Sequence, residues 1–156
     1  MSNSGFTLIE ALLASVILAM VVGAVVMPFT AGAANTAQNA RSTLAINLAQ
    51  DLMEEILAKP FHDPDESEAG ETGRSNWDDM DDYDGYSEGE WEIAGFDGVK
   101  VGDPSAVALT RDVTVESVYI AGQDQSEEPT FLRISVNIRY HEQEIVSLSR
   151  LAYANE

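Results

Sequence analysis

The sequence predicts an α+β protein in which a long N-terminal helix packs on a small antiparallel β-sheet. Three observations lead to this fold class. No charged residue lies between Glu10 and Arg41 in an apolar first stretch, leucines then recur every four residues, and the last third of the chain alternates between apolar and polar residues. We expect a leader at residues 1–5, an apolar half-helix at 6–30, an amphipathic half-helix at 31–59 and a head at 60–156.

The chain is strongly acidic and contains no cysteine. Its 156 residues include 27 acidic and 8 basic ones, which gives a formal net charge of −19. Disulfides are therefore excluded, and the head must be stabilised by packing, by neighbouring subunits or by a bound ion. A surface this acidic repels nucleic acids and anionic lipids, so we expect no direct binding of nucleic acid.

The apolar run extends from Phe6 to about Phe29. A helix of that length reaches about 36 Å, which is enough to cross a bilayer. A secretory signal peptide fits poorly, because the leader has no Lys or Arg and the run exceeds the usual 7–15 residues. A plain single-pass anchor would account for the run, but it leaves Glu10 unexplained, since a charge in lipid is costly.

Residues 5–10, GFTLIE, stand at the start of this run. Together with it they resemble the class III signal of type IV pilins and type II secretion pseudopilins, over about the first 40 residues. The resemblance implies that a prepilin peptidase cuts between Gly5 and Phe6 and that Phe6 is then N-methylated. It also implies a single-pass protein of the inner membrane with its head outside the cytoplasm. Such a protein joins other pilin-like subunits at an inner-membrane assembly platform.

A physical role for Glu10 follows from that cut. The new amino group of Phe6 would stand at a helix N-terminus, where negative charge is favoured. In a filament, Glu10 of one subunit could pair with the Phe6 amine of the next and fix the register between them. The alternative is a glutamate that lies in the head-group zone of the membrane.

Pro28 stands near the far end of the apolar run, with Gly23 and Gly32 on either side. Proline removes a backbone donor and clashes with the preceding turn. We expect a kink or a local opening of the helix at this point, as pilins commonly have. A proline that is simply tolerated in a membrane helix is the alternative.

Beyond Gly32 the pattern is that of an amphipathic helix. One face is apolar and comprises Leu44, Ala45, Leu48, Ala49, Leu52, Met53 and Ile56. The opposite face is polar and comprises Asn39, Arg41, Asn47, Gln50, Asp51, Glu54 and Glu55. We expect the apolar face to pack on the sheet of the head, and Pro60 to end the helix after Lys59.

Residues 63–92 contain 13 acidic residues and a single base, Arg74. The stretch from Asp63 to Gly73 predicts a mobile loop. The next segment combines Trp77, Tyr83 and Tyr86 with five aspartates: Asp78, Asp79, Asp81, Asp82 and Asp84. Two interpretations remain open, a solvated loop held by aromatic packing and a loop stiffened by Ca²⁺ with these aspartates as ligands. Its DDYDG sequence also resembles segments of minor pilins of the PilV and MshD kind.

The last third of the chain predicts the strands of the sheet. They are expected to begin within Trp91–Phe96 and to continue at residues 110–120, 131–140 and 144–153. The third is the clearest, because Leu132, Ile134, Val136, Ile138 and Tyr140 alternate with polar residues. This alternation is typical of a half-buried antiparallel strand.

No constellation in the sequence predicts an enzyme. The two histidines, His62 and His141, have neither the spacing of a metal cluster nor that of a catalytic triad. We therefore expect a structural subunit of a type IV pilus or a type II secretion pseudopilus, and a minor one by its DDYDG segment. The alternative is a bitopic membrane-anchored binding domain or adhesin that does not polymerise.

Overall fold

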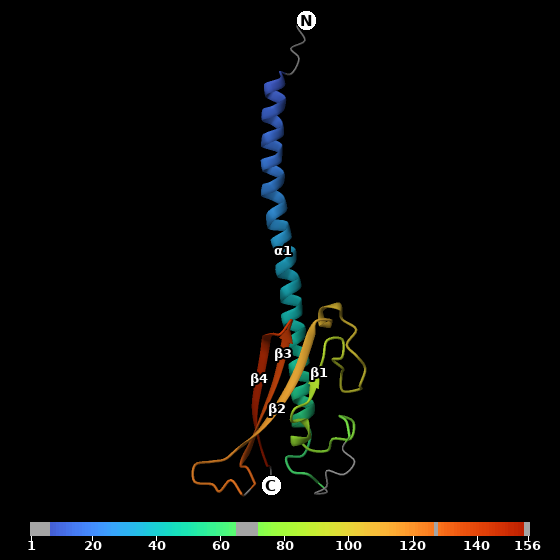
Figure 1. Ribbon diagram of the computed structural model, residues 1–156, viewed down its shortest axis with the longest axis vertical. Helices are drawn as coiled ribbons and strands as arrows, with labels where there is room; N and C mark the ends of the chain where they lie inside the picture. Colours follow the sequence, from blue (N-terminus) through green and yellow to red (C-terminus); the bar gives the residue numbers. More distant parts are fainter. Residues whose placement is uncertain (1–6, 65–71, 127, 155–156) are drawn as a thin grey trace. The chain divides into compact units, whose positions relative to one another are not determined.

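The α+β fold class is confirmed by the structure, a computed structural model that describes residues 7–64, 72–126 and 128–154. The chain forms two compact units, Met1–Asn39 and Ala40–Glu156, and helix α1 (Leu8–Leu57) has residues in both. The second unit contains a four-stranded antiparallel sheet in the order β1-β2-β3-β4 (Figure 1). Its elements are two 3-10 helices, η1 (Asp81–Tyr83) and η2 (Pro104–Ala106), and the strands β1 (Ser87–Glu88), β2 (Leu109–Val118), β3 (Phe131–Tyr140) and β4 (Gln143–Tyr153).

The first half of α1 is apolar and exposed. It contains an 18-residue window with a mean hydropathy of 2.6, none of which is buried. By length and composition this helix can cross a membrane, as the apolar run predicted. Helical structure continues through Pro28, so the kink or opening there stays a prediction.

The second half of α1 buries the apolar face that the sequence predicted. The buried residues are Ala45, Leu48, Ala49, Leu52, Met53, Glu55 and Ile56. Glu55 corrects the prediction, because its side chain was expected on the solvent face and is only 9% exposed. Arg74 and Tyr83 bind its carboxylate, which makes the burial tolerable. The helix ends at Leu57, two residues before Lys59.

The sheet supplies the other half of the core. On β3, Leu132, Ile134, Val136 and Ile138 alternate as buried residues and join the apolar face of α1 in one cluster. Strands β3 and β4 are connected by a two-residue turn at His141 and Glu142, both of which have positive φ angles. Two positive φ angles are what a type I′ hairpin requires, and this turn sets the register of the pairs Tyr140–Gln143 and Arg139–Glu144. The register then shifts between Arg139 and Ile138.

The expected strand at Trp91–Phe96 does not form. The segment folds into a local hairpin, here called the 93–101 hairpin, in which Val101 N donates to Ile93 O (2.9 Å) and Gly95 N donates to Val99 O (3.0 Å). Gly98 adopts φ 71° at the tip, which glycine does without strain. Because these backbone groups bond locally, the edge of β2 is covered instead by β1 through Ser87 and Glu88.

Candidate functional site

The N-terminal end of α1 is closed by a reciprocal contact between Thr7 and Glu10. The Thr7 amide and hydroxyl donate to Glu10 Oε2 at 2.9 and 2.8 Å, and the Glu10 amide donates to the Thr7 hydroxyl at 3.4 Å. This is a capping box, whose Thr-x-x-Glu signature was present in the sequence but not used in the prediction. Gly5 and Phe6, the residues of the predicted cut, lie outside the described residues.

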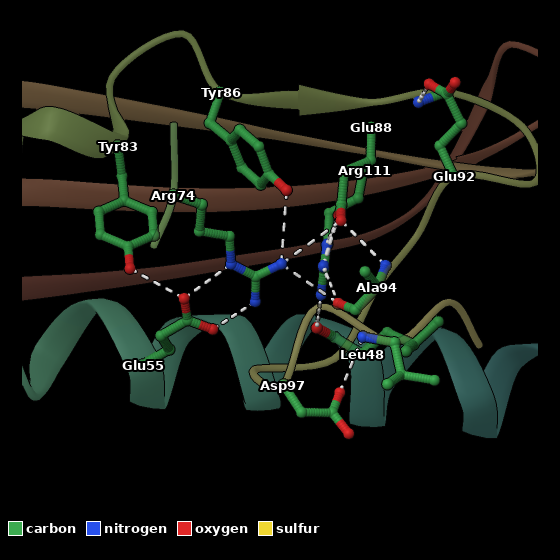
Figure 2. Close-up of polar contacts among 12 residues, drawn as sticks. Leu48, Glu55, Arg74, Tyr83, Tyr86, Glu88, Glu92, Ala94, Asp97 and Arg111 are labelled. Carbon is green, nitrogen blue, oxygen red and sulfur yellow. Dashed lines mark hydrogen bonds and ion pairs between the residues drawn. The ribbon is translucent and has the colours of Figure 1, made fainter. Parts of the chain in front are cut away.

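A buried ionic network lies at the centre of the second unit (Figure 2). Arg111 on β2 is 2% exposed and forms an ion pair with Glu88, which is 6% exposed. Its guanidinium also donates to two backbone carbonyls, Leu48 O on α1 and Ala94 O in the 93–101 hairpin, each at 2.9 Å. One cation thus connects the sheet, the helix and the hairpin.

Arg74 provides the second cation of this network. It binds Glu55 with two nitrogens, one of them Nε at 2.7 Å from Oε1, and it reaches Glu88 at 3.4 Å. It also donates to Ala94 O at 3.2 Å, so this one carbonyl accepts from both arginines. With two guanidiniums and two carboxylates, the network is electrically balanced.

The network keeps Glu55 ionised. Burial alone would raise the pKa of Glu55, but hydrogen bonds from Arg74 and Tyr83 and the charges of both arginines hold this pKa below its ordinary value. The Tyr83 hydroxyl donates to Glu55 at 2.9 Å. Burial and this contact raise the pKa of Tyr83, so the phenol remains a donor at physiological pH.

Two signals in the sequence could have revealed this network. On β2, Leu109, Arg111 and Val113 share the buried face, so alternation alone places the arginine in the core. Arg74 is the single base among 13 acidic residues between positions 63 and 92. The partners of either cation could not be inferred, because Glu55 and Glu88 come from distant parts of the chain.

The aromatic residues of the acidic segment pack against one another. Trp77 contacts Tyr83 and Tyr86 edge to face, with ring centroids 4.7 and 5.1 Å apart. Asp84 accepts a hydrogen bond from the Val115 amide at 2.8 Å and so caps the edge of β2. This packing fits the interpretation as a loop held by aromatic side chains. Of the preceding stretch that predicted a mobile loop, residues 65–71 lie outside the described residues.

The predicted calcium ligands are engaged with backbone amides. Asp82 accepts from the amides of Asp78 and Asp79 at 2.9 and 3.3 Å, and Asp79 accepts from those of Asp81 and Asp82 at 3.0 and 3.1 Å. Within the described ranges, no group of three or more His, Cys, Asp or Glu side chains is placed to hold a metal ion. Calcium binding at these aspartates and Asp84 stays a prediction.

Both histidines are exposed. His62 lies 3.6 Å from Glu128 and His141 lies 3.9 Å from Glu90. Each can form a surface ion pair when protonated, and such pairs contribute little to stability.

Residues 1–26 match the family model described as the prokaryotic N-terminal methylation motif. The chain carries this methylation motif. Because the motif is followed by a long apolar helix and a pilin-like α+β head, it supports a precursor of the type IV pilin or pseudopilin kind. The resemblance to the PilV and MshD kind has no further support, since neither curated proteins nor solved structures yield a match to the chain.

Proposed function

We propose that this protein is a structural subunit of a type IV pilus or type II secretion pseudopilus. The observation that carries the proposal is the methylation motif at residues 1–26, continuous with an apolar helix that can cross a membrane. In this proposal a prepilin peptidase cuts between Gly5 and Phe6. The subunit is stored in the inner membrane with its head outside the cytoplasm, and its α1 helix then packs into a filament.

The capping box gives the proposed assembly role of Glu10 a geometric basis. Thr7 holds only the Oε2 atom of Glu10, and in the described part of the chain Oε1 has no partner. After cleavage, Oε1 of one subunit could accept a hydrogen bond from the Phe6 amine of the next. Two charges that are costly in an apolar bundle would then neutralise each other.

The activity we propose is assembly, not catalysis, and the partners are other pilin-like subunits, the prepilin peptidase, the inner-membrane platform and membrane lipid. We also propose that the subunit is a minor one, on the strength of its DDYDG segment. A membrane-anchored adhesin that never polymerises would share the membrane helix, so the experiments below are chosen to separate the two.

The first expected result concerns processing. Purified from a host with a prepilin peptidase, the protein should have lost residues 1–5 and carry one methyl group on Phe6. Intact-mass measurement detects both changes. Gly5→Leu should block the cut, because a larger side chain replaces the small residue before it. A wild-type mass that still includes Met1, or a chain that begins beyond Phe29, contradicts the proposal.

The second expected result concerns assembly. Glu10→Ala should stay in the membrane with a folded head, but its share in sheared filaments should fall at least tenfold, because the Phe6 amine would be buried without a counter-ion. Immunoblots of filament and membrane fractions give that share. Glu54→Ala, which removes an exposed glutamate elsewhere on α1, is the matched control. Equal incorporation of the Glu10 variant and the control excludes the register role.

A further inference from the structure

The 93–101 hairpin exposes large apolar side chains on an otherwise acidic protein. Phe96 is 82% exposed and Val99 is 64% exposed. Asp97 lies between them in the sequence, and its Oδ1 accepts a hydrogen bond from the Val99 amide at 3.0 Å. We call Phe96, Asp97 and Val99 the hairpin tip. Residues 93–102 contain one acid and one base, so the hairpin is neutral within a chain of net charge −19.

A cavity of about 520 Å³ opens beside this hairpin. Its lining is mostly apolar and includes Trp91, Ile93, Val101, Pro104 and Val107, together with two charged residues, Lys100 and Asp103. We call it the loop cavity. A closed apolar cavity of roughly 150 Å³ already accepts benzene, so the loop cavity has room for a phenyl ring and a second side chain. Among the residues that the structure describes, Lys100 takes part in none of the ion pairs.

We propose that the hairpin tip of one copy of this chain inserts into the loop cavity of a second copy. Phe96 would fill the apolar part of the cavity, and Asp97 would pair with Lys100 of the second copy. Shape and charge both match, since an apolar ring beside an acid meets an apolar cavity at which Lys100 offers a base. The other charged residue of the lining, Asp103, accepts a hydrogen bond from the Ser105 amide at 2.7 Å. The apolar area supplies affinity, and the charge pair fixes the orientation.

The electrostatics of the chain favour this surface over others for contact between copies. Two molecules of net charge −19 repel each other wherever their acidic faces meet. The hairpin is neutral, and the charged residues at the cavity, Lys100 and Asp103, offset each other, so approach at this surface meets less of that repulsion. The hairpin tip and the loop cavity lie at different places on one surface. The contact can therefore close into a reciprocal dimer or continue as an open chain of subunits.

The buried ionic network holds this surface rigid. Both Arg74 and Arg111 donate to Ala94 O, and the Ala94 amide donates to Glu88 at 2.9 Å, so the base of the hairpin is fixed from both sides (Figure 2). Trp91, which lines the cavity, is held at φ 67°, a costly conformation for a bulky residue. A surface fixed in advance loses less entropy on binding.

This proposal rests on the proposed function only in treating the contact as one between subunits. It can be tested without filaments. The chain has no cysteine, so single cysteines can be introduced into the full-length protein without background. Two differently tagged chains, one with Val99→Cys and one with Val107→Cys, are co-expressed, and their membranes are treated with a short bismaleimide. We expect a cross-linked heterodimer that carries both tags, and this product supports the contact.

Three comparisons make the result specific. Adding Phe96→Ser to both chains should lower the cross-link yield at least tenfold, and the exposed position makes misfolding a poor explanation. Asp97→Lys should lower the yield, and Asp97→Lys combined with Lys100→Asp should restore it. Val99→Cys paired with Ser149→Cys, an exposed residue of β4, should give only the background of random collisions.

The proposal is overturned if the Val99–Val107 pair gives no more product than the Val99–Ser149 pair, or if Phe96→Ser leaves the yield unchanged. Failure of this contact is distinguishable from failure of the proposed function. A subunit that enters filaments without the cross-link lacks only the hairpin contact. A chain that cross-links in membranes but keeps its leader and never enters filaments contradicts only the pilus role.

Discussion

Replacing Arg111 by methionine is expected to destabilise the head by about 3–5 kcal/mol. The substitution keeps most of the apolar length of the side chain but removes the ion pair with Glu88 and the bonds to Leu48 O and Ala94 O. Glu88 would then lie buried with only the more distant Arg74 as a counter-charge, at 3.4 Å. A buried charge that loses its close partner is far more costly than a lost surface pair.

Urea unfolding of the full-length protein in detergent measures this loss. Tryptophan fluorescence is the suitable signal, because both tryptophans, Trp77 and Trp91, lie in the second compact unit. Helical content is less suitable, since the apolar half of α1 is expected to remain helical in a micelle.

Two further variants give this experiment its controls. Arg133→Met removes an exposed pair with Glu116 on the neighbouring strand and should cost less than about 1 kcal/mol. The double variant Arg111→Met, Glu88→Leu removes both charges and should cost less than Arg111→Met alone, because no unpaired charge remains. If Arg111→Met is no more destabilising than Arg133→Met, the network does not stabilise the fold.

The elements that the sequence predicted well are those defined by local periodicity. Leu48, Leu52 and Ile56 lie one helical turn apart, so a helix brings them to one face wherever the rest of the chain lies. The same holds for the alternating residues of β3, which can bury only one side of an antiparallel strand. Packing the two apolar faces together then follows from the need to bury them, and the α+β class was predictable.

The ionic network was not predictable, because its members meet only in the folded chain. Periodicity put Glu55 on the polar face of α1, and it could not show that Arg74, 19 residues later, would cover that position. The expectation of a strand at Trp91–Phe96 was wrong for a related reason. Its apolar residues have strand propensity, but local hydrogen bonds around Gly98 satisfy the backbone that a strand would have offered to β2.

The N-terminal site could be predicted in its local features but not in its contact with a second subunit. The GFTLIE signature and the charge-free run are linear features, and the methylation motif at residues 1–26 bears out the resemblance drawn from them. The capping contact between Thr7 and Glu10 is also a local feature and could have been predicted from the spacing of three. A contact between Glu10 and another subunit depends on a second chain, so it remains a proposal.

The head is expected to be most stable in mildly acidic solution, and Asp79 is the main reason. Asp79 precedes η1 in the chain and is only 4% exposed. Burial, and then a hydrogen bond with the Asp81 carboxyl, raise the pKa of Asp79 from 3.8 to about 7. The Asp82 amide donates to it and acts in the opposite direction, but it does not cancel the burial.

The sign of the effect follows from the protons bound in each state. Between about pH 4 and pH 7, the folded chain keeps a proton on Asp79 that the unfolded chain releases, so protonation favours folding. The free energy of unfolding should therefore fall as the pH rises to about 7, by at most about 4 kcal/mol, and then level off. Glu55 acts oppositely, because its pKa is lowered and the stability that it provides is lost below about pH 4.5.

Asp79→Asn isolates the contribution of this carboxyl group. The asparagine Oδ1 can still accept from the amides of Asp81 and Asp82, so the turn should persist without a titrating group. Urea unfolding at pH 5, 6, 7 and 8 should show the variant near wild type at pH 5 and more stable than wild type at pH 8. The matched control is Asp103→Asn, which removes an exposed carboxylate that caps the Ser105 amide. If Asp79→Asn and Asp103→Asn differ from wild type by constant amounts across this range, Asp79 is not protonated in the folded head and the stability maximum must have another origin.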